Sequence, residues 1–192
     1  LADLQGPKLR IGAVVKDTEL VDGDNIIIKT GKDFKGNNKK LYLNYNNLAK
    51  DIKKGEKILI DDGKIILKII EIDKKNEIIA EVVQGGILSS NKGFNLPNTN
   101  ISQPALTNKD IEDAIFSAKQ NVDWIALSFV RHGSDIESLI KLLDKNTNHR
   151  IPVIAKIEKP EGVRNIDEIM KFASGIMVAR GDLGVEINAA EV

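Results

Sequence analysis

The sequence has 192 residues, of which 42% are apolar and 29% are charged, with 28 basic and 28 acidic side chains. The apolar share suffices for a buried core, and the balanced charge lacks the basic excess of nucleic-acid-binding proteins. The absence of cysteine excludes disulfides and thiolate catalysis, and no apolar run approaches the ~20 residues of a membrane helix. We therefore expect a cytoplasmic protein of one or two domains that binds neither nucleic acid nor a membrane.

The first segment, residues 1–12, has the sequence LADLQGPKLRIG and places a turn at Gln5-Gly6-Pro7 between two short apolar pieces. The chain begins with Leu1 rather than methionine, and the residues that follow already belong to a motif. We expect this sequence to be an excerpt of a longer protein.

Residues 13–95 are predicted to form a small all-β domain, either a barrel or a sandwich. β-branched runs separated by polar turns are typical of short antiparallel strands. The clearest runs are 25–28, 57–60, 64–72 and 77–83, with turns at 61–63 and 73–76. The turn Asp61-Asp62-Gly63 is typical of a hairpin, although its two carboxylates would also suit a bound metal-nucleotide.

Residues 96–192 have a different rhythm, in which apolar strands alternate with amphipathic helices. Buried strands are predicted at 124–129, 152–157 and 175–179, with Trp124 in the core and Met170 on the inward face of the last helix. Three capping pairs predict where the helices begin: Thr107 with Asp110, Ser134 with Glu137, and Asn165 with Glu168.

This alternation is typical of parallel βα units. A complete (β/α)₈ barrel needs ~250 residues, so residues 96–192 supply at most about half of one. Either the sheet is open or the remaining units lie outside the chain. The predicted fold class is a partial (β/α)₈ TIM-type barrel with an inserted small β-barrel domain.

Charged residues follow two of the predicted strands. Lys156 and Glu158 leave the end of one strand on the same face, because side chains two residues apart share a face. Arg180-Gly181-Asp182 follows the next strand. Glu158 and Asp182 form a pair of hard oxygen ligands that suits Mg²⁺ or Mn²⁺, and Lys156 would stabilise an anion beside them. The simpler interpretation is a structural ion pair between Lys156 and Glu158.

Several motifs resemble those of the pyruvate kinase family. IPVIAKIEKPEGV resembles the active-site signature of that family, and MVARGDLGVE resembles its second metal-binding segment. LADLQGPKLRIG, IDDGKIILKI, NKGFNLPN and DWIALSFVR resemble further segments of the family in the same order, so that the resemblance covers essentially the whole chain.

The resemblance implies transfer of the phosphoryl group of phosphoenolpyruvate to ADP in glycolysis, giving pyruvate and ATP. It implies that Glu158 and Asp182 hold the divalent cation and that Lys156 stabilises charge on the phosphoryl group and the enolate oxygen. The backbone at Gly181 and Asp182 would bind the substrate carboxylate.

For residues 13–95 the resemblance implies a lid, with 1–12 leading into it and 96–192 carrying the active-site motifs. Arg10 and Lys92 match family positions that contact the nucleotide phosphates. From the sequence alone, Lys92 is equally well explained as a solvated turn lysine. The intact parent is expected to be a homo-oligomer, a homotetramer by resemblance, and the excerpt alone is expected to be inactive.

The monovalent-cation site of the family matches Asp3 and Leu4, where many members have threonine in place of Leu4. Lys8 occupies a position at which potassium-dependent members carry glutamate. The ammonium group of Lys8 would supply the charge that potassium provides, so that potassium would not be required. The alternative is that Lys8 points to solvent.

Two other functions remain open at this point. One is a metal-dependent lyase of the phosphoenolpyruvate/pyruvate barrel group, against which Lys156 and the inserted β-domain both argue. The other is a non-catalytic module that binds its ligand without turnover.

Overall fold

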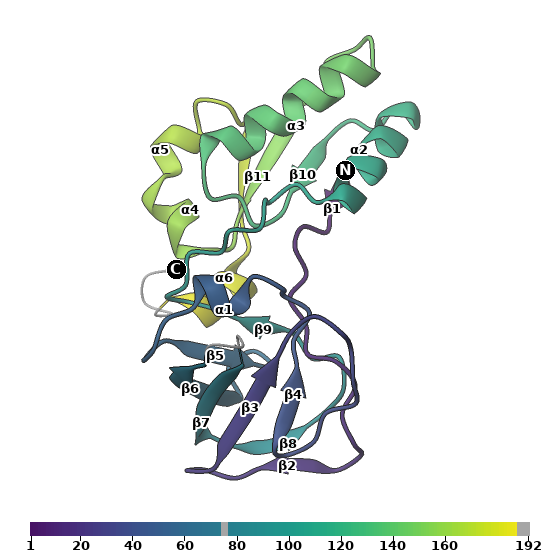
Figure 1. The fold of residues 1–192 in the computed structure, drawn as a ribbon. Coiled ribbons are helices and arrows are strands. Elements are labelled where there is room, and N and C mark those ends of the chain that lie inside the picture. The colour runs from purple at the N-terminus through teal and green to yellow at the C-terminus, as the bar shows by residue number, and fades with distance from the viewer. Residues whose placement is uncertain (74–76, 188–192) are drawn as a thin grey trace. The chain divides into compact units, whose positions relative to one another are not determined.

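The structure is a computed structural model that describes residues 1–73 and 77–187. The chain forms two compact units (Figure 1). The barrel unit combines residues 1–8 with the chain from Gln103 onward, and the β-unit comprises residues 9–102. The domain limits expected from the sequence, 1–12, 13–95 and 96–192, stay a prediction.

The barrel unit contains a four-stranded sheet in which every neighbouring pair of strands is parallel. Its strand order is β1-β10-β11-β12, with β1 at Ala2–Leu4, β10 at Ile125–Leu127, β11 at Val153–Ile157 and β12 at Gly175–Val178. β1 comes from the start of the chain, yet it pairs with β10 because its apolar residues extend the same buried sheet.

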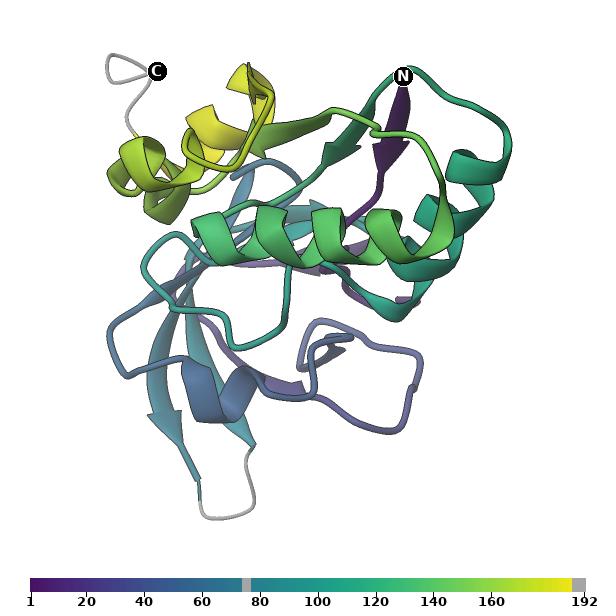
Figure 2. The same ribbon diagram turned by 90° about the horizontal axis from the view of Figure 1, so that it is seen from above.

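Helices follow or precede these strands in the βα rhythm that the sequence predicts. They are α2 (Asn108–Lys119), α3 (Gly133–Asn146), α4 (Pro160–Arg164), α5 (Ile166–Ile169) and α6 (Arg180–Glu186). Figures 1 and 2 both show α2 and α3 side by side, in agreement with their contacts. Within the described residues, no helix is long and apolar enough to cross a membrane.

The capping pair predicted for α2 is confirmed. The Thr107 hydroxyl accepts a hydrogen bond from the backbone N–H of Asp110, and the Asp110 carboxylate accepts one from the N–H of Thr107. The same carboxylate, fully buried, also accepts from the backbone N–H of Gly6 at 3.0 Å. Asp110 therefore holds the start of α2 against the turn that follows β1.

The capping pair predicted for α3 is wrong. The helix starts after His132, earlier than the predicted cap Ser134. The Asp135 carboxylate accepts hydrogen bonds from the backbone N–H groups of Arg131 at 2.9 Å and His132 at 3.0 Å. Asp135 thus satisfies the backbone donors at this helix start, a role that the sequence pattern assigned to Glu137.

The helix predicted after Asn165 is also different. α4 and α5 are two short helices with Asn165 between them, and Glu168 accepts a hydrogen bond from the N–H of Gly133 at the start of α3 rather than capping its own helix. Met170 is 52% exposed and Trp124 is 39% exposed, so neither is the core residue that was predicted.

The β-unit has a six-stranded sheet of order β4-β3-β7-β6-β5-β9 and a two-stranded sheet of β2 and β8. The elements are β2 (Thr18–Leu20), β3 (Asn25–Lys29), β4 (Lys40–Tyr42), α1 (Leu48–Asp51), β5 (Lys57–Ile60), β6 (Ile65–Ile72), β7 (Ile78–Gln84), β8 (Gly86–Leu88) and β9 (Phe94–Asn95). The alternating burial of β5, β6 and β7 produces a separate apolar core.

The predicted hairpin turn between β5 and β6 is confirmed. Asp61, Asp62 and Gly63 all adopt positive φ, at 53°, 58° and 83°. Aspartate tolerates this left-handed region better than most side chains, and glycine adopts it without steric cost. The other predicted turn, 73–76, lies largely outside the described residues. The predicted fold class, a partial parallel βα barrel with an inserted small β-domain, is confirmed.

Candidate active site

Lys156 lies at the centre of a polar cluster at the carboxyl ends of the parallel strands. Its Nζ lies 3.1 Å from both carboxylate oxygens of Asp3, 2.9 Å from Ser128 Oγ and 3.2 Å from Glu158 Oε1. Ser128 Oγ donates its own proton to the carbonyl oxygen of Leu4 at 2.7 Å, so it accepts from the ammonium group. Asp3 from β1, and the residues that directly follow β10 and β11, therefore hold one cation, the Lys156 ammonium group.

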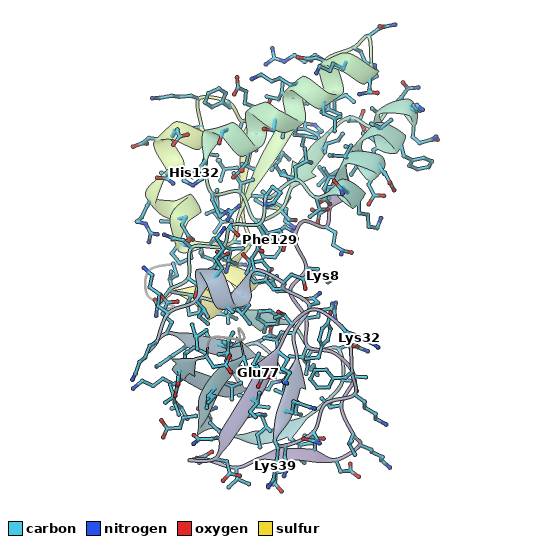
Figure 3. The ribbon with its side chains drawn as sticks, viewed as in Figure 1. Lys8, Lys32, Lys39, Glu77, Phe129 and His132 are labelled. Atoms are coloured by element: carbon cyan, nitrogen blue, oxygen red, sulfur yellow. The ribbon has the colours of Figure 1, made fainter. Side chains whose placement is uncertain are left out.

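Glu158 is deeply buried in this cluster, with 3% of its side chain exposed. Its Oε2 accepts a hydrogen bond of 2.9 Å from the backbone N–H of Phe129, which follows β10 and is labelled in Figure 3. Phe129 has a φ of 56°, an uncommon conformation for an aromatic residue. Such strain persists where surrounding contacts enforce it.

Gly6 supplies one of those contacts. It has a φ of 68°, and a Cβ built on it would lie 2.8 Å from a ring carbon of Phe129. The Gln5-Gly6-Pro7 turn therefore packs against the residue whose N–H holds Glu158. The sequence pattern pointed to a turn here but gave no sign of its contact with Phe129.

The electrostatics of Glu158 favour an additional cation. Burial raises the pKa of the Glu158 carboxyl, and the nearby charge of Asp182 raises it further. Lys156 and the Phe129 N–H act in the opposite direction without cancelling the rise. Burial lowers the pKa of Lys156, but the charges of Glu158 and Asp3 outweigh burial, so its pKa is raised and it remains an ammonium ion.

Asp182 is brought toward Glu158 by the pairing of β11 with β12. Ile157 pairs with Val178, and the N–H of Ala179 donates to the carbonyl oxygen of Ile157 at 3.2 Å. The first turn of α6, which contains Gly181 and Asp182, therefore starts beside the end of β11. A side chain added at Gly181 would meet no atom within 4 Å, so the backbone there is open.

Glu158 and Asp182 fit a divalent cation of the magnesium type. Across residues 1–73 and 77–187, no group of three or more acidic, histidine or cysteine side chains is arranged to hold a metal. Mg²⁺ is commonly bound through one or two carboxylates, with water and substrate phosphate completing its shell. A pair of carboxylates that includes the buried Glu158 matches that kind of site better than an all-protein cage.

The residues that the sequence predicts for a monovalent-cation site lie in β1 and in the segment that follows it. Leu4 is buried and its carbonyl accepts the Ser128 hydroxyl, while Asp3 is half exposed and paired with Lys156. Lys8 is exposed after the turn at Gly6.

Arg10 and Lys92 lie on adjacent extended segments of the β-unit. Arg10 bridges Gly93, and its guanidinium donates to the carbonyl oxygen of Asn91 at 2.5 Å. Lys92 Nζ lies 2.9 Å from Asp61 Oδ1 at the β5–β6 turn. Hydrogen bonds from Lys92 and Lys64 lower the pKa of Asp61, so Asp61 is ionised.

The comparisons with known proteins agree with these features. The family model described as "Pyruvate kinase, barrel domain" matches residues 1–192. Pyruvate kinase of Corynebacterium glutamicum is 46% identical over 192 residues, covering 100% of this chain and 40% of that protein. Pyruvate kinase of Mycobacterium intracellulare is 46% identical over 193 residues, with the same coverage.

Pyruvate kinase of Geobacillus stearothermophilus is 43% identical over 198 residues, covering 100% of this chain and 33% of that protein. The chain thus spans about 40% or less of the length of these curated relatives. A family model that matches along the whole chain, together with relatives at this identity, shows that the chain belongs to the pyruvate kinase family.

Proposed function

We propose that the chain works as part of a full-length pyruvate kinase, which transfers the phosphoryl group of phosphoenolpyruvate to ADP and yields pyruvate and ATP. The observation that carries the proposal is the polar cluster at the strand ends, in which Lys156 contacts Asp3, Ser128 and Glu158. A fixed ammonium group next to a buried carboxylate suits charge stabilisation in phosphoryl transfer.

In this mechanism Lys156 faces the transferring phosphoryl group and the enolate oxygen that forms as the bond to phosphorus breaks. Its contacts with Asp3 and Ser128 fix its position before substrate arrives. Preorganisation of this kind lowers the barrier, because little rearrangement is needed when charge develops.

Glu158 and Asp182 hold Mg²⁺ or Mn²⁺ in the proposed enzyme. The bound cation supplies positive charge that offsets the carboxylate, enolate and phosphoryl oxygens. The Phe129 N–H keeps the Glu158 carboxylate oriented, and the backbone at Gly181, where the surrounding space is open, and at Asp182 receives the substrate carboxylate.

Arg10 and Lys92 bind phosphate groups of the nucleotide in the proposal. Lys92 is held by Asp61, so phosphate binding would replace one anionic partner of Lys92 by another. Asp3 and the Leu4 carbonyl form the monovalent-cation site of the family, where Lys8 provides the charge instead of potassium. The full-length protein is proposed to be a cytoplasmic homotetramer.

The test is a phosphoenolpyruvate and ADP assay of the full-length protein, with and without Mg²⁺. We expect metal-dependent formation of pyruvate and ATP. Absence of transfer with Mg²⁺ and with Mn²⁺ would overturn the proposal. Pyruvate formation that does not depend on ADP would mean that water accepts the phosphoryl group, and would also contradict the proposal.

A further inference from the structure

A second ion pair lies next to the proposed metal ligands and has no part in the mechanism above. Lys159 Nζ and Glu186 Oε1 are 2.5 Å apart. The side chain of Lys159 is 6% exposed and that of Glu186 is fully buried. By contrast, the pair formed by Lys141 and Glu137 on α3 has side chains that are 65% and 43% exposed.

The pair connects the two segments that carry the metal ligands. Lys159 directly follows Glu158 in the chain and is the residue before α4. Glu186 is the last residue of α6, four positions after Asp182, and therefore lies one helical turn farther along on the same side of the helix.

The two ends of α6 are thus attached independently to the segment 153–159, which contains β11 and Lys159. At its start, the N–H of Ala179 donates to the carbonyl oxygen of Ile157. At its end, Glu186 is bound to Lys159, and between them Leu183 is buried in the core of the barrel unit. These two attachments determine how far α6 lies from the segment that contains β11 and Lys159, and in which direction the axis of α6 runs.

Stability alone does not account for burying two charges here. Removing both ions from water carries a desolvation penalty that their attraction only partly offsets, and apolar residues of similar volume often serve as well or better. An ion pair differs from an apolar contact in being directional, since its hydrogen bond holds two atoms at a defined separation.

We propose that Lys159 and Glu186 are positioning residues, which hold α6 so that the Asp182 carboxylate and the Glu158 carboxylate bind one divalent cation together. This inference rests on the proposed function, in which those two carboxylates are the metal ligands. Groups that orient metal ligands in this way typically contribute 10–100-fold to metal affinity.

The test replaces both charges at once in the full-length protein, as Lys159→Met with Glu186→Leu. A single replacement would leave the other charge buried without its partner and would destabilise the fold for that reason alone. Mn²⁺ affinity is measured by electron paramagnetic resonance of the free ion without substrate, and thermal unfolding is followed separately. The matched control is Lys141→Met with Glu137→Leu on α3.

We expect the double variant to fold with an unfolding temperature close to that of the wild type and to bind Mn²⁺ about tenfold more weakly. The control should bind Mn²⁺ as the wild type does. Glu186→Gln, which keeps an oxygen acceptor for Lys159, should lose less affinity than the double variant.

An unchanged Mn²⁺ affinity in the folded double variant would overturn the inference, and failure of that variant to fold would reassign the pair to stability. A wild type that binds no Mn²⁺ would overturn both this inference and the proposed metal ligands. A wild type that binds Mn²⁺ but transfers no phosphoryl group would contradict only the proposed function.

Discussion

At the scale of single residues, the role of Lys156 can be separated from that of the carboxylates around it. Lys156→Met keeps a side chain of similar length but removes the charge. We expect turnover in the full-length protein to fall about 10²–10³-fold, as on loss of one transition-state donor, because this charge acts mainly when the phosphoryl group leaves. Mn²⁺ affinity, measured in parallel, should change little. Near-normal turnover in this variant would remove Lys156 from the mechanism.

Glu158 should give the protein a distinctive pH dependence, because its pKa is raised by burial and by Asp182. An acid with a higher pKa in the folded state binds its proton more tightly there, so the associated stability is present at low pH and is lost as pH rises through the folded-state pKa. Metal binding requires the ionised form. As the pH is lowered, Mn²⁺ affinity should therefore start to fall at a higher pH than it would for a glutamate with an ordinary pKa.

Unfolding in denaturant across a pH series, without metal, measures this contribution. Glu158→Gln should remove the loss of stability with rising pH and should also weaken Mn²⁺ binding. Glu137→Gln on the exposed face of α3 serves as the control, since its partner Lys141 is itself largely exposed. A pH profile of stability that is the same in wild type and Glu158→Gln would contradict the prediction.

Lys8 decides the expected dependence on monovalent cations. Carboxylate and phosphate charges gather near Asp3 and the Leu4 carbonyl in the proposed mechanism, and a covalently attached ammonium group can offset them. We expect the full-length protein to be as active in tetramethylammonium as in potassium at equal ionic strength. Lys8→Glu should make it dependent on potassium. A strong loss of wild-type activity without potassium would refute the role of Lys8.

At the scale of elements, the turn after β1 is predicted to support the site through Gly6. Gly6→Ala introduces a side chain at a φ of 68° and only 2.8 Å from the Phe129 ring. Gly55→Ala is the matched control, because Gly55 also has a positive φ, of 89°, but has open space around it. In both variants the free energy of unfolding should fall by roughly 1 kcal/mol through backbone strain.

Gly6→Ala should lose more stability than the Gly55→Ala control, because the ring of Phe129 must move. It should also weaken Mn²⁺ binding, since Phe129 orients Glu158 through its N–H. Denaturant unfolding of each variant and a Mn²⁺ titration provide the two measurements. Equal stability losses with unchanged Mn²⁺ affinity in both variants would show that the Gly6–Phe129 contact does not support the site.

The elements that the sequence predicts well are those with a strong local signal. The β-branched runs of the β-unit and the apolar runs of the parallel sheet appear as strands, and the Thr107–Asp110 pair caps its helix. The start of α3 was missed because its cap position is occupied by His132, which is not among the usual cap residues, although Asp135 satisfies the backbone donors there locally. The split at Asn165 was missed because Glu168 binds the N–H of Gly133 in another helix, a contact that depends on tertiary packing.

The contacts of the candidate site likewise include some that a local sequence pattern predicts and some that it does not. Lys156 and Glu158 are two residues apart on one strand, so their proximity follows from local geometry. Asp3 is separated from Lys156 by 153 positions, and no local pattern links them. The Phe129 contribution comes from a backbone N–H, which no side-chain pattern reveals.

At the scale of the whole molecule, the open sheet of the barrel unit has consequences for the chain studied alone. Among residues 1–73 and 77–187, the sheet has the order β1-β10-β11-β12, and its outer strands β1 and β12 each pair on one side only. Leu1 beside β1 is 61% exposed and Val178 at the end of β12 is 49% exposed. Parallel sheets are normally covered on both faces, and unpaired strand edges promote association with other chains.

We therefore expect the 192-residue chain to self-associate and to catalyse no transfer from phosphoenolpyruvate to ADP. Sedimentation at several concentrations would report association, and Val178→Lys should reduce it, because a charged side chain at a strand edge opposes pairing. Lys141→Met on α3, away from both edges, should leave association unchanged. The expected inactivity follows from length, because the chain covers only 40% of a relative such as that of Corynebacterium glutamicum. A monomeric chain with clear phosphoryl transfer would show that Lys156, Glu158 and Asp182 need far less surrounding structure than proposed.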